Sequence, residues 1–488
     1  MAQLILAIDQ GTTGTTALLL DENLAVRGKG YREIPQSYPA PGWVEHDPEA
    51  IWLSVLAAVA EARAQAGTGT IAGIGIANQR ETVLCWDRAT GKAVAPAIVW
   101  QDRRTGDRCE ALRAAGLEAT FERSTGLLLN PYFSGTKMAW LLDNIAGLRR
   151  RAEAGSVAFG TIDSFLVWRL SGGRSFVTDV SNASRTLLLD IGNLAWNPDL
   201  CRLLSVPAAA LPRVIPSAGP CATTSGMEQI ADGTPIAGIA GDQQAALFGQ
   251  GCLAPGDAKC TFGTGAFLLM NVGARPIHSR HGLLATVAWQ TPRGTDYALE
   301  GSAFVAGALV QWLRDGLGII KSAPESEGLA ASVPDTGGVT VVPALAGLGA
   351  PHWRPEARGL IYGISRGTTA GHIARAALEA IVLQNVDLVR AMERDAGRAI
   401  TSLRVDGGAA TNDLLMQMQA DLLGTDIVRP AMVESTALGA GRLAALGLGL
   451  ESPHETGPNL QVSIFHPRIA PAEREERLAR WRDALARC

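Results

Sequence analysis

The sequence predicts an α/β protein whose two similar lobes face one cleft. Near the start, within residues 4–20, two apolar runs flank a turn of Gly, Thr and Gln, which is typical of two buried strands joined by a tight turn. The same plan of strand, Gly/Thr turn and strand returns about 250 residues later, at residues 259–270. A single core rarely exceeds about 300 residues, whereas this chain has 488. We therefore expect two domains, residues 1–248 and 249–488.

The composition is that of an ordinary globular protein, with 47% hydrophobic residues and a formal charge of −4. Such a near-neutral charge argues against a nucleic-acid surface. Seven Cys, an odd number without a Cys-x-x-Cys pair, indicate reduced thiols in a cytoplasmic protein. Asp9 interrupts the first apolar run, which has no basic segment before it, so we expect no signal peptide. No run of about 18 apolar residues occurs, so no membrane span is predicted.

The first half alternates strands and helices. Asp47 followed by Pro48 predicts a helix start, with Asp as N-cap, and this helix runs to about Gln65, before Gly67. A second helix follows Tyr132. Four prolines between residues 207 and 220 indicate a loop-rich stretch. Further strands are expected at residues 25–34, 71–77, 94–99 and 236–240, with more helix and strand at 160–170 and 175–189.

The second half repeats this alternation after its own Gly/Thr turn. A loop rich in Gly and Pro occupies residues 347–355, and a strand ends at the Gly-Gly pair of residues 407–408 before another helix. The tail from Ala472 alternates Glu and Arg, which is typical of a solvated helix. Long helices are predicted at residues 300–317, 369–396 and 434–446.

Polar residues follow several of the predicted strands, where open α/β sheets bind ligands. Arg80 and Glu81 come just after the strand at 71–77, and Trp100 follows the strand at 94–99. From spacing alone, a surface ion pair and a core aromatic explain these residues equally well. The first Gly/Thr turn likewise fits either an ordinary hairpin turn or a cradle of N–H and hydroxyl groups for phosphate.

Phosphoryl transfer is the chemistry that best fits the polar and glycine-rich motifs of this chain. The chain has no Walker-type loop, no G-x-G-x-x-G after its first strand and no H-E-x-x-H. It has two Gly/Thr turns, a Gly-Gly-Ala turn, and acids at strand ends: Asp9, Asp242 and Asp406. Asp242 is the candidate general base, with Gln243 beside it to orient the acceptor, whereas Asp9 would act through Mg²⁺.

A set of motifs in fixed order resembles the FGGY family of carbohydrate kinases, and above all its glycerol-phosphorylating members. The resemblance runs from Ile5 to about Leu446. It implies two RNase H-like lobes of the actin-like ATPase type, each a five-stranded mixed sheet with flanking helices, around a central cleft. The motifs are DQGTTGTT at 9, GWVEHDP at 42, NQRET at 78, IVWQDRRT at 98, NPYFSGTK at 130, GDQQAALFGQ at 241, FGTGAF at 262, GAPHWRPEARGLIYGISRGTT at 349 and RVDGGAATN at 404.

This resemblance implies ATP-dependent phosphorylation of glycerol to sn-glycerol 3-phosphate with Mg²⁺. Residues 1–248 would bind glycerol and phosphate, and residues 249–488 the nucleotide. Glycerol would contact Arg80, Glu81, Trp100, Tyr132, Asp242, Gln243 and Phe267. The nucleotide would contact Thr12, Thr13, Gly14, Thr264, Gly307, Gln311, Gly408 and Asn412, and the metal Asp9 and Asp242. We further expect a homodimer or a homotetramer.

Three departures from the family pattern alter the expectation. Thr16 stands where many bacterial relatives carry Arg, so the first turn lacks a positive charge near the phosphates. Residues 230–235 lack the Arg of the loop through which regulated relatives bind fructose 1,6-bisphosphate, so we expect no such inhibition. The region of Phe465 does not resemble family C-termini and gives no support for a regulatory phosphotransferase partner.

Two other functions stay open at this stage. A kinase of another polyol or sugar, such as xylulose or erythritol, would share Asp9 and the Gly/Thr turns but would usually lack the Arg-Glu pair together with Trp100 and Tyr132. An ATP-driven chaperone or filament protein of the same superfamily would need no acceptor site and no counterpart of Asp242. A panel of acceptor substrates distinguishes the first alternative from a glycerol-phosphorylating enzyme, and substitution of Asp242 distinguishes the second.

Overall fold

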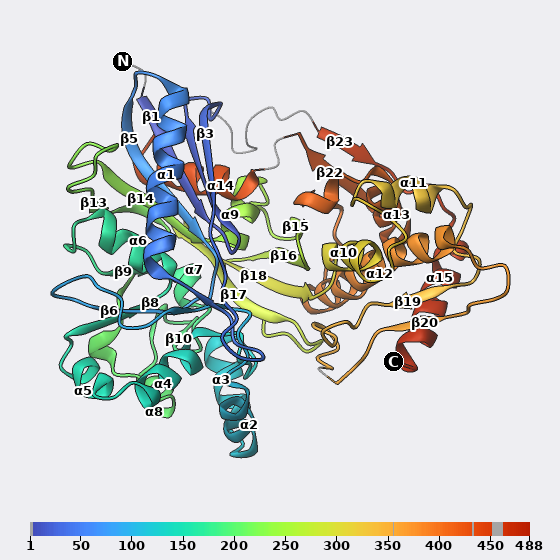
Figure 1. Cartoon of the computed structure of the whole chain (residues 1–488), viewed down its shortest axis with the longest axis horizontal. Coiled ribbons are helices and arrows are strands. Elements are labelled where there is room, and N and C mark those ends of the chain that lie inside the picture. Colours follow the sequence, from blue (N-terminus) through green and yellow to red (C-terminus); the bar gives the residue numbers. More distant parts are fainter. Residues whose placement is uncertain (1–2, 355, 432–433, 451–461) are drawn as a thin grey trace.

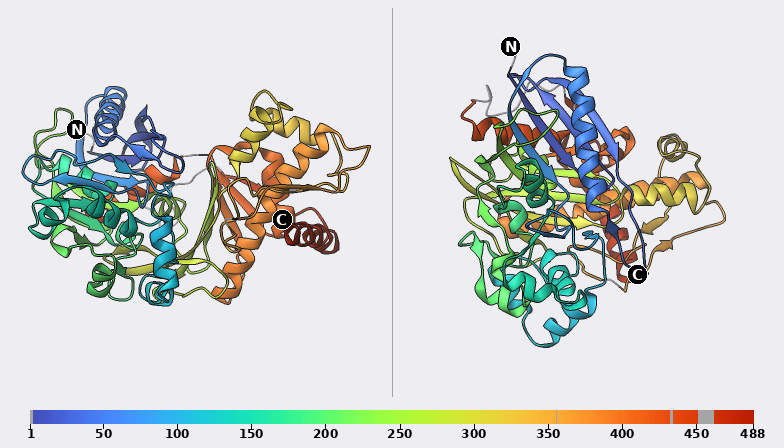
Figure 2. Two further views of the ribbon diagram at one scale, coloured as in Figure 1. Left: turned by 60° about the horizontal axis from the view of Figure 1, so that its bottom comes forward. Right: turned by 60° about the vertical axis from the view of Figure 1, so that its left-hand side comes forward.

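The computed structural model describes residues 3–354, 356–431, 434–450 and 462–488. Pro355, the last residue of the predicted Gly/Pro loop, lies outside this part of the chain. Two α/β lobes lie beside each other, the first built largely from the blue and green half of the chain and the second from the yellow and red half (Figures 1 and 2). Within the described ranges, no helix is both long and apolar enough to cross a membrane.

The first lobe is built on a six-stranded mixed sheet. In the middle, β14, β5 and β1 are parallel, whereas β2 and β3 continue antiparallel from β1. The order across the sheet is β13 (Ala218–Thr223), β14 (Pro235–Gly241), β5 (Thr70–Asn78), β1 (Gln3–Gln10), β2 (Gly14–Leu20) and β3 (Val26–Glu33). Strand β13 lies in the proline-rich stretch that was predicted to be a loop, and it brings the sheet to six strands where five were predicted. It contains Pro220, which a sheet tolerates at its edge because an edge strand has a free side.

The second lobe carries a seven-stranded sheet, also wider than the predicted five. Its order is β17 (Leu284–Thr291), β18 (Gly294–Ala303), β16 (Ala266–Gly273), β15 (Ala258–Phe262), β21 (Ser402–Asp406), β22 (Asp426–Pro430) and β23 (Val462–Phe465). The predicted helix at 300–317 is wrong in its first part. Residues 300–303 pair with β16, and a Cβ on Gly301 would lie 2.6 Å from Leu388 Cδ2, so the small residues allow a helix to pack closely on this strand.

Helices cover both sheets. Helix α1 (Pro48–Ala66) packs on β2 and β3 and begins as predicted, with the Asp47 side chain accepting from Glu49 N. The long helix α12 (Ala370–Ala396) packs on β16 and β18 of the second sheet. Around it lie α10 (Gly307–Asp315), α11 (Glu325–Ala331), η2 (Gly408–Thr411), α13 (Asp413–Leu423) and α15 (Pro471–Ala486), with the hairpin of β19 (Thr340–Val342) and β20 (Leu360–Tyr362). Helix α15 is less solvated than predicted, because Leu478 and Trp481 are buried.

Helix α14 (Ser435–Gly447) crosses between the halves of the chain. It comes from the second half, yet it packs on β1, β5 and β14 of the first sheet, where its orange-red ribbon stands among blue and green strands (Figure 1). It also crosses α9 (Asp242–Gly249) at a distance that only glycine permits: a Cβ on Gly439 would lie 1.8 Å from Ala245 O. This crossing supports the start of α9, where Asp242 lies.

The rest of the first half packs partly on the apolar core of the first sheet and partly around a second apolar core beside it. Its short strands are β4 (Glu45–His46), β6 (Leu84–Asp87), β7 (Ala97–Ile98), β8 (Val157–Gly160), β9 (Val177–Asp179), β10 (Leu189–Asp190), β11 (Ala195–Trp196) and β12 (Arg213–Ile215). Its helices are α2 (Gly106–Ala114), α3 (Glu118–Thr125), α4 (Ser134–Asn144), α5 (Leu148–Glu153), α6 (Ile162–Leu170), α7 (Val180–Ala183), α8 (Pro198–Leu203) and η1 (Ala208–Ala210).

Candidate active site

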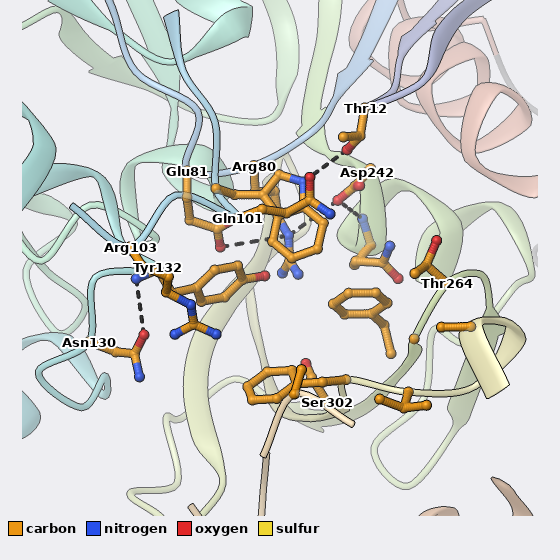
Figure 3. Close-up of a pocket in the computed structure, with 18 of the residues that line it drawn as sticks. Thr12, Arg80, Glu81, Gln101, Arg103, Asn130, Tyr132, Asp242, Thr264 and Ser302 are labelled. Carbon is orange, nitrogen blue, oxygen red and sulfur yellow. Dashed lines mark hydrogen bonds and ion pairs between the residues drawn. The ribbon is translucent and has the colours of Figure 1, made fainter. Parts of the chain in front are cut away.

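A cavity of about 540 Å³ opens between the lobes at the carboxyl ends of β1 and β5. Most of the residues predicted to bind glycerol or phosphate line it, and Figure 3 shows them converging from both lobes. These are Thr12, Thr13, Arg80, Glu81, Trp100, Tyr132, Asp242, Gln243, Thr264 and Phe267. The predicted strand ends therefore do meet at one place.

Asp242 begins α9 directly after β14, and its side chain keeps 25% of its surface exposed. Its Oδ1 lies 3.2 Å from Arg80 Nε and accepts a hydrogen bond of 2.7 Å from Gln243 N. Burial raises the pKa of Asp242, and the charges of Arg80 and Lys259 partly oppose this. The result is a carboxylate that is held in place on one oxygen and is more basic than an ordinary Asp.

Arg80 and Glu81 follow β5 and are almost fully buried, at 2% and 1% exposure. Glu81 has φ +61°, a left-handed conformation that costs energy in a residue with a side chain and that tends to occur at functional sites. Its Oε1 accepts from Arg185 Nε at 2.7 Å. Burial raises the pKa of Glu81, with Arg80 and Arg185 acting against it. This pair is therefore part of the site and not a surface ion pair.

Three aromatic rings form a wall on one side of the cavity. Trp100 stands edge to face with Tyr132 at a centroid distance of 5.6 Å and with Phe267 of the second lobe at 6.0 Å. Trp100 Nε1 donates to Thr12 Oγ1 at 2.8 Å, so a hydrogen bond connects this wall to the first Gly/Thr turn. Burial raises the pKa of Tyr132 well above its usual value, which keeps its hydroxyl protonated as a donor.

Each of the two Gly/Thr turns is closed by a backbone hydrogen bond from one glycine to another, three residues further on in the first turn and two in the second. Gly11 N donates to Gly14 O at 2.9 Å, and Gly263 N donates to Gly265 O at 2.9 Å. In the first turn Gly14 has no room for a side chain, because a Cβ would lie 2.6 Å from Tyr31 Oη. In the second, Gly307 N donates to Gly263 O at 3.0 Å, which places the start of α10 against the turn. The repeat that the sequence predicts is thus a repeat of two antiparallel strands joined by a Gly/Thr turn, and the two turns differ in length.

The other residues predicted for the nucleotide do not line this cavity. Gly14 and Gly307 support the two turns, whereas Gln311 and Gly408 are exposed on the second lobe. Asn412 accepts from Leu415 N at 2.8 Å and so caps α13. Gln311, Gly408 and Asn412 lie outside this cavity, and the contact of all five residues with a nucleotide stays a prediction.

Several carboxylates lie close to Asp9, the residue that comes shortly before the first Gly/Thr turn. Burial raises the pKa of Asp9 well above its usual value, and the charges of Asp242, Glu434 and Asp406 raise it further. Among the described residues, Asp9 Oδ1 and Asp406 Oδ1 are buried without a hydrogen-bond partner. An excess of negative charge with unpaired oxygens fits Mg²⁺, which binds one or two carboxylates together with substrate phosphates. No group of three or more His, Cys, Asp or Glu in the described ranges could hold a metal by itself.

Comparison with known families identifies the chain. The profile of the N-terminal domain of the FGGY family of carbohydrate kinases matches residues 4–249, and that of its C-terminal domain matches residues 258–448. The chain belongs to the FGGY family of carbohydrate kinases.

Relatives of this FGGY chain include proteins named glycerol kinase. The one from Alkalilimnicola ehrlichii is 56% identical over 99% of this chain and 98% of its own length, and the one from Myxococcus xanthus is 54% identical over 100% and 99%. The solved structure of Plasmodium falciparum glycerol kinase with ADP has a TM-score of 0.92 at 34% identity and covers 100% of this chain and 98% of that one. A gluconate kinase structure from Lactobacillus acidophilus, at 22% identity and a TM-score of 0.88, shares the fold.

The FGGY site also contains residues that the sequence did not single out. Lys259, fully buried on β15, donates from Nζ to Gln243 Oε1 and, at 2.7 Å, to Thr261 Oγ1. Because lysine is rarely buried, its position within a predicted strand was a signal in the sequence that it has a special role. The further lining residues are Gln36, Gln101, Arg103, Asn130, Leu284, Ser302, Phe304, Val305, Ala308, Leu345, Ala346 and Trp353, and some lie inside the quoted motifs.

Proposed function

We propose that this chain transfers the γ-phosphoryl group of ATP to glycerol, forming sn-glycerol 3-phosphate and ADP. The observation that carries the proposal is the position of Asp242. It lies in the cavity beside Arg80, between the phosphate-type turns and the aromatic wall. The relatives named glycerol kinase, which match the chain over nearly its whole length, support the same acceptor.

Glycerol has little apolar surface, so hydrogen bonds have to supply its binding. Arg80, Glu81 and Asp242 offer charged partners, which form stronger hydrogen bonds than neutral groups do. A site that bonds each hydroxyl rejects analogues lacking one by up to about 10⁴-fold. The rings of Trp100 and Phe267 would cover the carbon side of the molecule.

In the reaction, the Asp242 carboxylate takes the proton of the attacking hydroxyl. The hydroxyl oxygen then bonds to the γ-phosphorus as the bond to ADP breaks. The turns of Thr12 and Thr264 hold the phosphates through N–H and hydroxyl groups. Asp9 and Asp242 would hold Mg²⁺, which supplies positive charge at the phosphates. Thr16 pairs with Asp9 across β1 and β2, so the first turn brings no cation of its own.

Replacement of Asp242 tests the mechanism. Asp242→Asn keeps the shape but removes the base, so glycerol phosphorylation should fall by at least about 10²-fold while ATP affinity stays nearly unchanged. Asp163→Asn is a matched control, because Asp163 is fully buried in the same lobe but does not line the cavity. Phosphorylation that survives in Asp242→Asn would refute the proposed mechanism.

A coupled ADP-release assay with a panel of acceptors tests the substrate. Glycerol should be preferred over xylulose and erythritol. A preference of tenfold or more for a sugar would assign the chain to another FGGY activity. A lack of turnover with every acceptor, together with ATP hydrolysis, would favour the chaperone or filament alternative.

We also propose that the enzyme works in the cytoplasm as a homodimer or a homotetramer. The seven free cysteines support a reducing compartment, and five of them, at 85, 109, 201, 252 and 260, are buried. Light scattering coupled to size-exclusion chromatography tests the assembly, and a monomer of 51.1 kDa would refute it.

A further inference from the structure

We propose that Glu300, which belongs to the second lobe, is a positioning residue for glycerol: its carboxylate fixes the Arg80 guanidinium so that one N–H is left for a hydroxyl of the acceptor. The inference rests on the proposed function. It adds a residue from β18 to a clamp whose other charged members come from the first lobe.

The contacts of Glu300 are with two arginines of the first lobe. Its Oε2 accepts from Arg80 Nη1, and its Oε1 accepts from Arg80 Nη2 at 3.2 Å. The same Oε1 accepts from Arg185 Nη2 at 2.8 Å. Exposure is 0% for the side chains of Glu300 and Arg185 and 2% for that of Arg80. Because these side chains are buried, water offers no competing partner, and the hydrogen bonds fix the orientation of the Arg80 guanidinium.

A count of donors shows what Arg80 has left. A guanidinium carries five N–H groups. Nε faces Asp242 Oδ1 at 3.2 Å, Nη1 donates to Gln244 Oε1 and to Glu300, and Nη2 donates once to Glu300. Among the described residues this leaves one N–H of Nη2 without a protein acceptor, on a side chain that lines the cavity. Glu300 therefore determines which N–H the acceptor meets.

The charge balance requires Glu300 to be ionised. Burial by itself raises the pKa of a carboxyl, but the charges of Arg185 and Arg80 outweigh it and lower the pKa of Glu300. Without that negative charge, two buried guanidinium groups would face each other with too few partners, and an unpaired buried charge is costly. Arg80 would then turn toward its remaining partners, Asp242 and Glu81.

Arg185 extends the same chain of contacts to the other side of the cavity. Its Nε donates to Glu81 Oε1 at 2.7 Å, and its guanidinium lies 5.8 Å from the centroid of the Tyr132 ring. Opposite charges thus alternate along Glu81, Arg185, Glu300 and Arg80. One side chain of the second lobe links three residues predicted to bind glycerol.

Glu300 lies on β18, next to the edge strand β17, in the part of the second lobe that packs on the first. Ser184 and Thr286 share a hydrogen bond of 2.8 Å, and Tyr297 Oη donates to Ile191 O at 2.8 Å. In Figure 1, β17 and β18 reach across to the first lobe beside α7. Arg80 therefore receives its partner from the interface where the two lobes pack on each other.

The test is Glu300→Gln, which keeps the shape and removes the charge. We expect the KM for glycerol to rise by at least about tenfold, the loss of one charge-assisted bond, with a smaller fall in kcat. The KM for ATP should stay within about twofold, because the Gly/Thr turns are untouched. Glu300→Asp, which keeps the charge on a shorter arm, should recover part of the loss in glycerol affinity.

Glu379→Gln is the matched control. Glu379 is a carboxylate of α12 in the same lobe, its side chain is 8% exposed, and it pairs with Arg477 at 3.2 Å, away from the cavity. This control should lose stability without a change in either KM. An unchanged KM for glycerol in Glu300→Gln, or a parallel rise in both KM values, would overturn the inference. If Glu300→Gln does not fold, a KM for glycerol in Glu300→Asp equal to that of the wild type would overturn it.

The two proposals fail in different ways. If the unmodified protein does not phosphorylate glycerol, or if Asp242→Asn remains active, the proposed function is wrong. If the unmodified protein phosphorylates glycerol and Asp242→Asn does not, but the Glu300 variants bind glycerol normally, only the positioning role is wrong.

Discussion

Gly241 is the residue whose enlargement should most directly disturb the acceptor site. Its φ of −60° and ψ of 150° suit any residue, so Gly241→Ala introduces no backbone strain. The added Cβ would lie 2.6 Å from Arg80 Cδ and 2.7 Å from Arg80 Cγ, whereas carbons in contact need about 3.5 Å. Arg80 must therefore retreat by roughly 1 Å. Its Nε, now 3.2 Å from Asp242 Oδ1, would leave hydrogen-bonding range.

The expected cost follows from the bond that is lost. A hydrogen bond to a charged group contributes about 1.5–3 kcal/mol, which corresponds to roughly a 10- to 150-fold fall in kcat/KM for glycerol. The assay is steady-state ADP release at varied glycerol and saturating ATP. Gly328→Ala on α11 makes the same change where no atom lies within 4 Å of the new Cβ, and it should leave kcat/KM unaltered. A folded Gly241→Ala enzyme within threefold of the wild type would show that the placement of Arg80 does not limit the reaction.

Three further predictions concern neighbouring parts of the molecule. Trp100→Phe and Thr12→Val each remove the 2.8 Å hydrogen bond between the Trp100 ring and the first Gly/Thr turn, so each should lower kcat/KM. In a double-mutant cycle, kcat/KM of the double variant should be no lower than that of the less active single variant. Burial lowers the pKa of Lys137, which donates to Tyr132 O, from 10.5 to about 7. Between these two pKa values the unfolded state binds more protons than the folded state. The stability of the wild type relative to Lys137→Met should therefore rise by about 1.4 kcal/mol per pH unit from pH 7 to 9 and stay constant below pH 7. Urea titrations at a series of pH values measure this difference. Fructose 1,6-bisphosphate should not inhibit, because the loop at 230–235 carries no Arg, and strong inhibition in the ADP-release assay would contradict this.

Much of the fold could be predicted because its signals are local. The N-cap at Asp47, the strand that ends at Asn78 and the long helix that begins after Thr369 each depend on a few neighbouring residues. The sheet edges could not be predicted in the same way. Strand β13 lies in a proline-rich stretch, and β18 extends into small residues that resemble a helix start. In both places pairing with a distant strand overrides the local preference.

The sequence by itself determined the two Gly/Thr turns, the acids at the strand ends and membership of the FGGY family, because these depend on residue types at short spacings. Only the tertiary structure decided which side chains meet. Arg80 and Glu300 are 220 residues apart, and nothing near Glu300 in the chain marks it as part of an acceptor site. The packing of two sheets against each other selects such pairs, since a buried charge is stable only where the fold supplies its partner.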